Sequence, residues 1–188
     1  KTSIAVIFVG ILTYTVAQRS GCQNSLQAVQ NLDINNFFTG SWYATHMKDA
    51  SNGAACREYN FQMSQGLIKL NANGEYTIKG VKKHYTTTCS STSGNPLIPA
   101  GPFLLKCRHT HKVDNKDNNI FFDLTWTIIE TDYQDYAFAY RCTKYDDNTI
   151  HSGNLVLLHR DKKANGSKAT NSLARYKLAL SNFKNLNC

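Results

Sequence analysis

The sequence predicts an all-β domain, an eight-stranded up-and-down antiparallel barrel that carries one helix near the C-terminus. Between residues 40 and 160, eight segments follow one another at short spacing, and several of them alternate apolar and polar residues with a period of two. The last part of the chain changes to a helical period. Closing such a sheet removes its exposed edges, and eight strands enclose an interior just wide enough for one small ligand.

The first seventeen residues have the composition of a secretory signal peptide. Lys1 precedes a short apolar run at residues 4–12, and small residues follow up to Ala17. The run is too short for a membrane span. We therefore expect a domain formed by residues 18–188 in a secreted, extracellular protein. Removing the seventeen residues leaves 171 and takes away one lysine, so the net charge falls from +8 to +7.

The elements can be assigned in order along the domain. An irregular arm, residues 18–35, contains one expected helical turn at residues 26–29. The first strand is 40–48, and its alternation places Trp42, Ala44 and His46 on one face. Further strands are expected at residues 55–63, 67–77, 81–89, 103–111, 120–130, 136–144 and 153–160.

Two boundaries need a separate argument. Asn73 and Gly74 form a possible tight turn, but we favour one long strand to residue 77 and a turn after it. Near the C-terminus, apolar residues recur at helical spacing and predict a helix over residues 167–182: Leu173, Tyr176, Leu180 and Phe183.

The domain contains six cysteines, widely spread and without a C-x-x-C pair, so a zinc site is not indicated. An even number in an exported protein indicates three disulfides, for which the sequence alone allows 15 connectivities. The sequon that begins at Asn165 is a candidate glycosylation site.

Three stretches carry a family resemblance: residues 37–46 with Gly40-Ser41-Trp42, residues 55–59, and residues 130–137 with Cys142 beyond them. They resemble the salivary lipocalins of blood-feeding triatomine bugs, the pallidipin, triplatin and triabin group. The resemblance implies that Trp42 closes the narrow end of the barrel under Arg160. It also implies the disulfides Cys22–Cys142, Cys56–Cys188 and Cys89–Cys107.

The same resemblance argues against a haem cofactor. Haem-binding members of the wider group use a histidine of the third strand, and residues 67–73 contain none. His109 and His111 share one strand face and could hold a metal ion, but two exposed strand histidines are the simpler interpretation. No catalytic motif is present, and every cysteine is assigned to a disulfide. We therefore expect a binding protein without enzymatic activity and without a bound metal or cofactor.

The expected ligand site is the barrel interior. His46 faces inward if Trp42 does, and Phe122 and Trp126 can line the wall. Tyr140 and Arg141 are neighbours, so only one of them faces the cavity. If that residue is Arg141, its guanidinium would bind a carboxylate or a phosphate.

The resemblance implies a protein that counters host haemostasis by sequestering a small platelet agonist, such as the eicosanoid thromboxane. A scavenger of ADP, another nucleotide or a biogenic amine is the alternative. A third interpretation is a surface-mediated inhibitor of a coagulation protease or of contact activation, with a host coagulation protein as partner. The positive net charge argues against triabin-like binding to a basic thrombin exosite. No nucleic-acid-binding motif is present.

Overall fold

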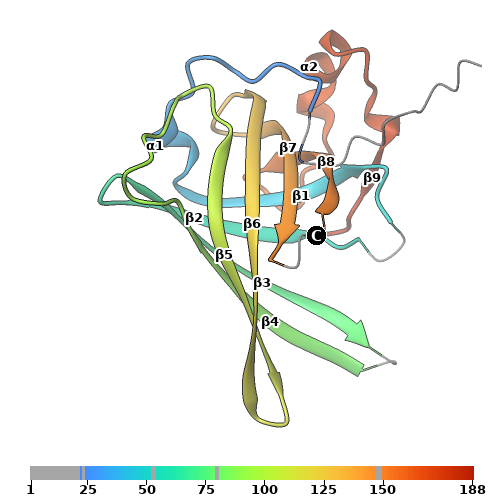
Figure 1. Cartoon of the computed structure of the whole chain (residues 1–188). Helices are drawn as coiled ribbons and strands as arrows, with labels where there is room; N and C mark the ends of the chain where they lie inside the picture. Colours follow the sequence, from blue (N-terminus) through green and yellow to red (C-terminus); the bar gives the residue numbers. More distant parts are fainter. Residues whose placement is uncertain (1–21, 23, 52–53, 79–80, 147–149) are drawn as a thin grey trace, which may run out of the picture.

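The computed structural model describes residues 22, 24–51, 54–78, 81–146 and 150–188. Eight antiparallel strands form a closed barrel, because β1 pairs with both β2 and β8 (Figure 1). The strands are β1 Gly40–Lys48, β2 Arg57–Ser64, β3 Leu67–Ile78, β4 Val81–Ser90, β5 Phe103–Val113, β6 Lys116–Thr131, β7 Tyr136–Tyr145 and β8 Ile150–His159. The predicted barrel is thereby confirmed. The predicted signal peptide lies outside the described residues.

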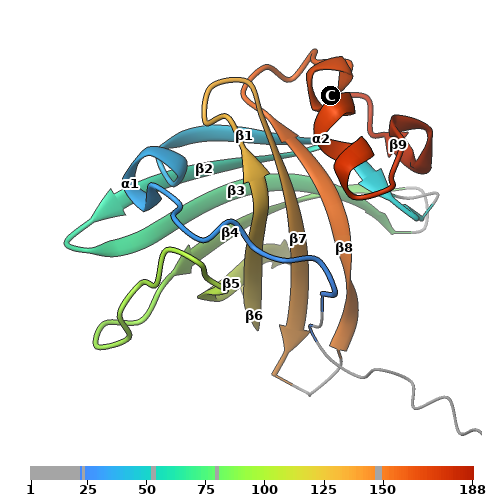
Figure 2. The same ribbon diagram turned by 90° about the horizontal axis from the view of Figure 1, so that it is seen from above.

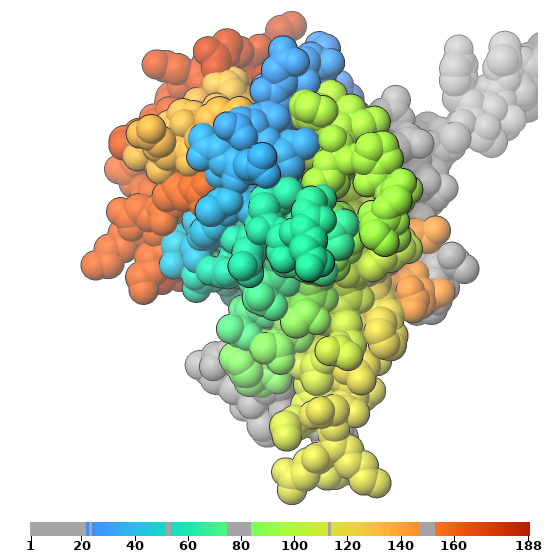
Figure 3. All heavy atoms as spheres, turned by 90° about the vertical axis from the view of Figure 1, so that its left-hand side faces the viewer, coloured from blue at the N-terminus to red at the C-terminus, as the bar shows by residue number. Residues whose placement is uncertain are grey.

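The two hairpins β3–β4 and β5–β6 extend beyond the barrel wall and separate from each other (Figure 1). Pairing between β4 and β5 reaches only Tyr85 and His111, whereas β5 and β6 remain paired as far as Val113 and Lys116. The tip of the β5–β6 hairpin projects from the molecule (yellow in Figure 3). The preferred long strand β3 is confirmed, because Gly74 pairs with Tyr85 within the ladder instead of turning.

The opposite end of the barrel is closed by aromatic side chains. The short helix α1, Ile34–Phe37, precedes β1, so the helical turn is not at residues 26–29 as expected. Asp33 starts α1 by accepting a hydrogen bond from the Asn36 amide. Phe37 stacks on Trp42 with ring centroids 5.2 Å apart, and Phe38 contacts Phe61 and Phe103.

The segment after β8 is not the single helix that was expected. It consists of η1 Ser167–Ala169, α2 Thr170–Arg175, η2 Leu180–Asn182 and the short strand β9 Phe183–Asn185, which pairs with β1. The helix ends because Lys177 takes a left-handed conformation, with φ 58°. The amides of Lys177 and Leu178 then bond to the carbonyls of Ala174 and Leu173, the pattern of a Schellman motif.

Two apolar cores result. The larger core fills the closed end and middle of the barrel. A second core lies between the outer wall of the barrel and the C-terminal segment, and includes Phe138, Leu157, Leu173 and Phe183. Figure 2 shows this segment beside the barrel and not inside it. Within the described ranges, no helix has the length and apolar character needed to cross a membrane.

Candidate functional site

A small cavity lies inside the barrel between side chains of strands β2 to β7. Its volume is about 20 Å³, which is room for about one water molecule, so the side chains of the wall lie close together. Apolar side chains form one part of its wall: Leu70, Ala72, Phe122 and Leu124. Polar and aromatic side chains form the rest: Arg57, Tyr59, Asn73, Tyr85, Thr87, His109 and Arg141. The cavity therefore combines an apolar surface with a small group of polar side chains, which is typical of a small-molecule site.

Two arginines give the cavity its charge. Arg57 starts β2 and its guanidinium carbon lies 5.6 Å from the ring centroid of Tyr85, while Arg141 reaches the cavity from β7. Among the described residues, neither guanidinium has a hydrogen-bond or ion-pair partner, and no carboxylate lines the cavity. Unpaired guanidinium groups bind carboxylates and phosphates through charge-assisted hydrogen bonds. The arrangement can hold an anionic group next to an apolar chain.

His109 lies beside these arginines in its neutral form. Its Nδ1 is 2.5 Å from the Thr87 hydroxyl oxygen, and its ring is 4.3 Å from that of Tyr85. Burial lowers the pKa of His109 to about 4, and the positive charges of Arg57 and Arg141 act in the same direction. The cavity thus presents two fixed positive charges and one neutral imidazole near pH 7.

Of the two aromatic residues expected in the cavity wall, only Phe122 lines the cavity. Phe122 lines the cavity and contacts the rings of His109 and Tyr145. Trp126 is fully buried in the larger core beneath it, in edge-to-face contact with Tyr59 at 5.1 Å. It supports the floor of the cavity and is not one of the residues that line it.

The choice between Tyr140 and Arg141 is resolved by β7. Arg141 faces the cavity, whereas Tyr140 belongs to the outer core under the C-terminal segment. The tyrosine ring covers Gly153 of β8, where a Cβ atom would come within 2.2 Å of it. Of the two alternatives, Arg141 is therefore the residue that lines the cavity, and Tyr140 does not.

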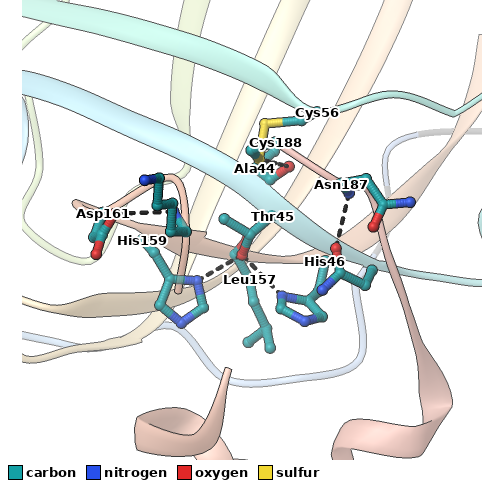
Figure 4. Close-up of a disulfide and its surroundings, with 11 residues drawn as sticks. Ala44, Thr45, His46, Cys56, Leu157, His159, Asp161, Asn187 and Cys188 are labelled. Atoms are coloured by element: carbon teal, nitrogen blue, oxygen red, sulfur yellow. Dashed lines mark hydrogen bonds between the residues drawn. A yellow bond between two sulfur atoms is a disulfide. The ribbon is translucent and has the colours of Figure 1, made fainter. Parts of the chain in front are cut away.

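His46 does not line the cavity either, because a β-bulge interrupts the alternation of β1. The register with β8 shifts between Ala44 and His46, so that Ala44 and Met47 pack on the interior core while His46 turns outward. His46 is buried, 3% exposed, and its Nδ1 lies 2.9 Å from the Thr45 hydroxyl (Figure 4). It lies close enough to Gly166 that a Cβ atom there would be 3.2 Å from its ring.

Arg160 covers the Trp42 indole at the closed end of the barrel, as the family resemblance implied. The guanidinium carbon of Arg160 lies 3.8 Å from the ring centroid of Trp42. Its nitrogens donate to backbone carbonyls that include those of Thr39, Ser41 and Tyr133. The six cysteines are joined as Cys22–Cys142, Cys56–Cys188 and Cys89–Cys107.

Sequence reasoning missed most of the polar cavity residues. Arg57 and Tyr59 alternate with Glu58 along β2, and this period of two could have placed both on one face. The register that sets Tyr59 opposite Trp42, and hence inside, is a tertiary feature. Thr87 and His109 are likewise brought together only by the pairing of β4 with β5.

The fold and cavity can be compared with known proteins. The family model described as Triabin matches residues 15–172. The chain belongs to the Triabin family. Two relatives from Triatoma infestans are each 32% identical: Triafestin-2 over 166 residues, covering 86% of this chain and 79% of the relative, and Triafestin-1 over 190 residues, covering 98% and 89%. The resemblance to triatomine salivary lipocalins is thus confirmed.

Solved structures share the fold of this Triabin family member. LTBP1, in a complex with leukotriene C4, is 26% identical with a TM-score of 0.59, and the match covers 90% of this chain and 96% of that chain. The amine binding protein of Rhodnius prolixus, in a complex with tryptamine, is 22% identical with a TM-score of 0.62, covering 89% and 86%. The second comparison supports the lipocalin fold alone.

Proposed function

We propose that this protein is a secreted salivary lipocalin that sequesters a small anionic lipid of the eicosanoid class, such as thromboxane, in its barrel. By removing a platelet agonist it would inhibit platelet aggregation and so counter host haemostasis. It acts as a binding protein and not as an enzyme. The observation that carries the proposal is the pair of arginines, Arg57 and Arg141, that lie on an apolar cavity without a carboxylate partner among the described residues.

The chemistry of an eicosanoid matches this wall. Its carboxylate can pair with a guanidinium, and its hydrocarbon chain can cover Leu70, Phe122 and Leu124 once the side chains of the wall have moved apart. Binding therefore requires the cavity to widen from about 20 Å³. LTBP1, which binds leukotriene C4, supports this ligand class. A biogenic amine fits poorly, because a cationic ligand would face two positive charges without a carboxylate among the described residues of the wall.

Two other functions compete with this proposal, and the experiment below distinguishes them. ADP could place its phosphates near the arginines and its base against Tyr85, so it is the main competing ligand. Inhibition of a coagulation protease or of contact activation would use the outer surface and would not need the cavity.

The test is a calorimetric titration of the mature protein with a stable thromboxane mimic, leukotriene C4, ADP and serotonin. We expect binding of one or both eicosanoids. Replacing Arg57 or Arg141 with glutamine should weaken that binding by at least about tenfold, because a hydrogen bond to a charged group contributes about 1.5–3 kcal/mol. Arg108→Gln is the matched control, because Arg108 is exposed on β5 and does not line the cavity.

The outcomes separate the three functions. If only ADP gives a binding signal, the ligand is a nucleotide and not an eicosanoid. Absence of binding to every ligand, together with a prolonged plasma clotting time, would replace it by a surface-mediated function. Equal affinities of the wild type and both arginine variants would refute the role of the arginines.

A further inference from the structure

One buried polar group in the barrel has no partner in the part of the chain that the structure describes. The Tyr59 hydroxyl is shielded from solvent, and the whole residue is 3% exposed. Among the described residues, none forms a hydrogen bond with this hydroxyl. Burial of a hydroxyl without a hydrogen bond is unfavourable, so native proteins rarely retain one without a reason. Replacing this tyrosine by phenylalanine would remove the unsatisfied group at almost no change in shape.

The position of Tyr59 points to a ligand. Its side chain lines the same cavity as Arg57 and Arg141. The indole N–H of Trp126, which packs edge-to-face against Tyr59, is also without a partner among the described residues. Two buried donor groups without partners, the Tyr59 hydroxyl and the Trp126 indole N–H, are therefore carried by neighbouring side chains next to an otherwise apolar core.

The two polar regions lie at different depths. Arg57 and Tyr59 are two residues apart on β2, about 7 Å along the strand, and Phe61 of the closed end follows two residues later. The arginines are only partly buried, whereas the Tyr59 hydroxyl is not accessible to solvent. A charged head group is more favourable at the arginines, since deep burial of an ion is costly. The inner position suits a neutral oxygen.

We propose that Tyr59 selects ligands that carry a hydroxyl or keto oxygen on the hydrocarbon chain, beyond the anionic head group. This inference rests on the proposed function and adds to it the residue that would recognise the oxygen atom on the hydrocarbon chain. The tyrosine donates its hydroxyl proton to the ligand oxygen. A ligand without that oxygen leaves the hydroxyl unpaired in a space now closed by hydrocarbon.

The experiment compares arachidonic acid with monohydroxylated derivatives whose hydroxyl lies near the carboxylate, in mid-chain or near the tail. Affinities are measured by calorimetry for the wild type and for Tyr59→Phe. We expect at least one hydroxylated isomer to bind the wild type about tenfold more tightly than arachidonic acid. In Tyr59→Phe this ratio should fall below about twofold, while the affinity for arachidonic acid is kept.

A matched control is Tyr140→Phe, which removes a tyrosine hydroxyl on the outer face of the barrel and should keep the tenfold ratio. Thermal unfolding of the ligand-free protein gives a second measurement. Because the Tyr59 hydroxyl has no partner to lose among the described residues, Tyr59→Phe should unfold at the same temperature as the wild type or higher. A clear fall in that temperature would indicate a structural tyrosine and would contradict the proposal.

The remaining outcomes distinguish this inference from the proposed function. If the wild type binds arachidonic acid and all its hydroxylated derivatives equally, Tyr59 does not select, although the protein still binds fatty acid-like anions. If the ratio persists in Tyr59→Phe, another residue selects the oxygen. If no fatty acid derivative binds, the proposed eicosanoid function fails together with this inference.

Discussion

Two buried histidines share one hydroxyl group on the outer face of the barrel. Thr45 Oγ1 lies 2.9 Å from Nδ1 of His46 and 2.6 Å from Nδ1 of His159 (Figure 4). Burial lowers the pKa of both rings, and for His159, where the charge of His46 adds to the effect, the value is about 4. The cluster is uncharged near pH 7, which allows it to lie beneath the C-terminal segment. It is a structural group, since it does not line the cavity.

His159 should make the protein sensitive to acid. Its pKa is about 4 in the folded protein, against the ordinary histidine value of 6.5 in the unfolded chain, so the unfolded chain binds more protons between these values. Its contribution, about 3 kcal/mol, is present above pH 6.5 and is lost as the pH falls towards 4. Urea unfolding of His159→Asn between pH 7 and pH 4 should show a smaller loss of stability than the wild type. His84→Asn, at an exposed position of β4, should retain the full loss.

At the level of elements, the C-terminal segment is held on the barrel by its buried apolar side chains. Its apolar residues pack on the barrel as the helical spacing suggested, but they come from a short helix, a 3₁₀ turn and a strand. Leu173 is fully buried in the outer core, whereas Arg175 forms an ion pair with Glu130 while its side chain remains 63% exposed. Exposed ion pairs contribute little, because water already solvates both charges.

Leu173 and Arg175, both in α2, should therefore respond differently to replacement by alanine. We expect Leu173→Ala to reduce the free energy of unfolding by about 2–5 kcal/mol, the range for a buried leucine. Arg175→Ala should leave the melting temperature almost unchanged. Chemical denaturation of both variants checks this. A larger effect from Arg175 would mean that the ion pair, and not the apolar contact, holds the helix.

The turn before η1 makes Asn165 available for modification. Asn165 is exposed, and its Oδ1 accepts a hydrogen bond of 3.0 Å from the Ser167 amide. Gly166 has φ 82°, which keeps the turn tight. We propose that a glycan is attached to Asn165 when the protein passes through a eukaryotic secretory pathway.

Protein secreted from insect cells should then show a mass excess that an N-glycosidase removes. Ser167→Ala should abolish the excess, and Ser167→Thr should keep it, because both serine and threonine complete the sequon. Unmodified wild-type protein from the same cells would contradict the proposal. Since the turn lies outside the cavity, ligand affinity should not depend on the glycan.

For the molecule as a whole, one end of the barrel is closed and the other is open. At the closed end, Arg160 lies on the Trp42 indole and joins carbonyls from α1, β1 and the turn before β7. The Cys22–Cys142 disulfide joins the segment before α1 to β7, and the Cys56–Cys188 disulfide joins the C-terminal segment to the residue before β2. Away from this closed end, the β3–β4 and β5–β6 hairpins separate from each other.

Removing the closing arginine should destabilise the whole barrel. Arg160→Ala loses the contact with the indole and leaves several carbonyls without their donor, which we expect to reduce the free energy of unfolding by about 2–4 kcal/mol. Arg160→Lys should recover less than half of the loss, because an ammonium group cannot both stack on the ring and donate to separate carbonyls. Thermal and chemical unfolding measure both effects. Arg108→Ala, at an exposed site, should change neither.

The sequence by itself determined the barrel, most strand positions and the pairing of the closing residues. Periods of two report which residues share a face, and Gly40, Trp42 and the cysteines carry a family pattern. Only the tertiary structure decided which side chains form the cavity. A bulge at Thr45 reversed the face of His46, and strand register brought Arg57, Tyr59, His109 and Arg141 together. Register and bulges depend on contacts between strands distant in sequence, so the local pattern of any one strand does not contain them.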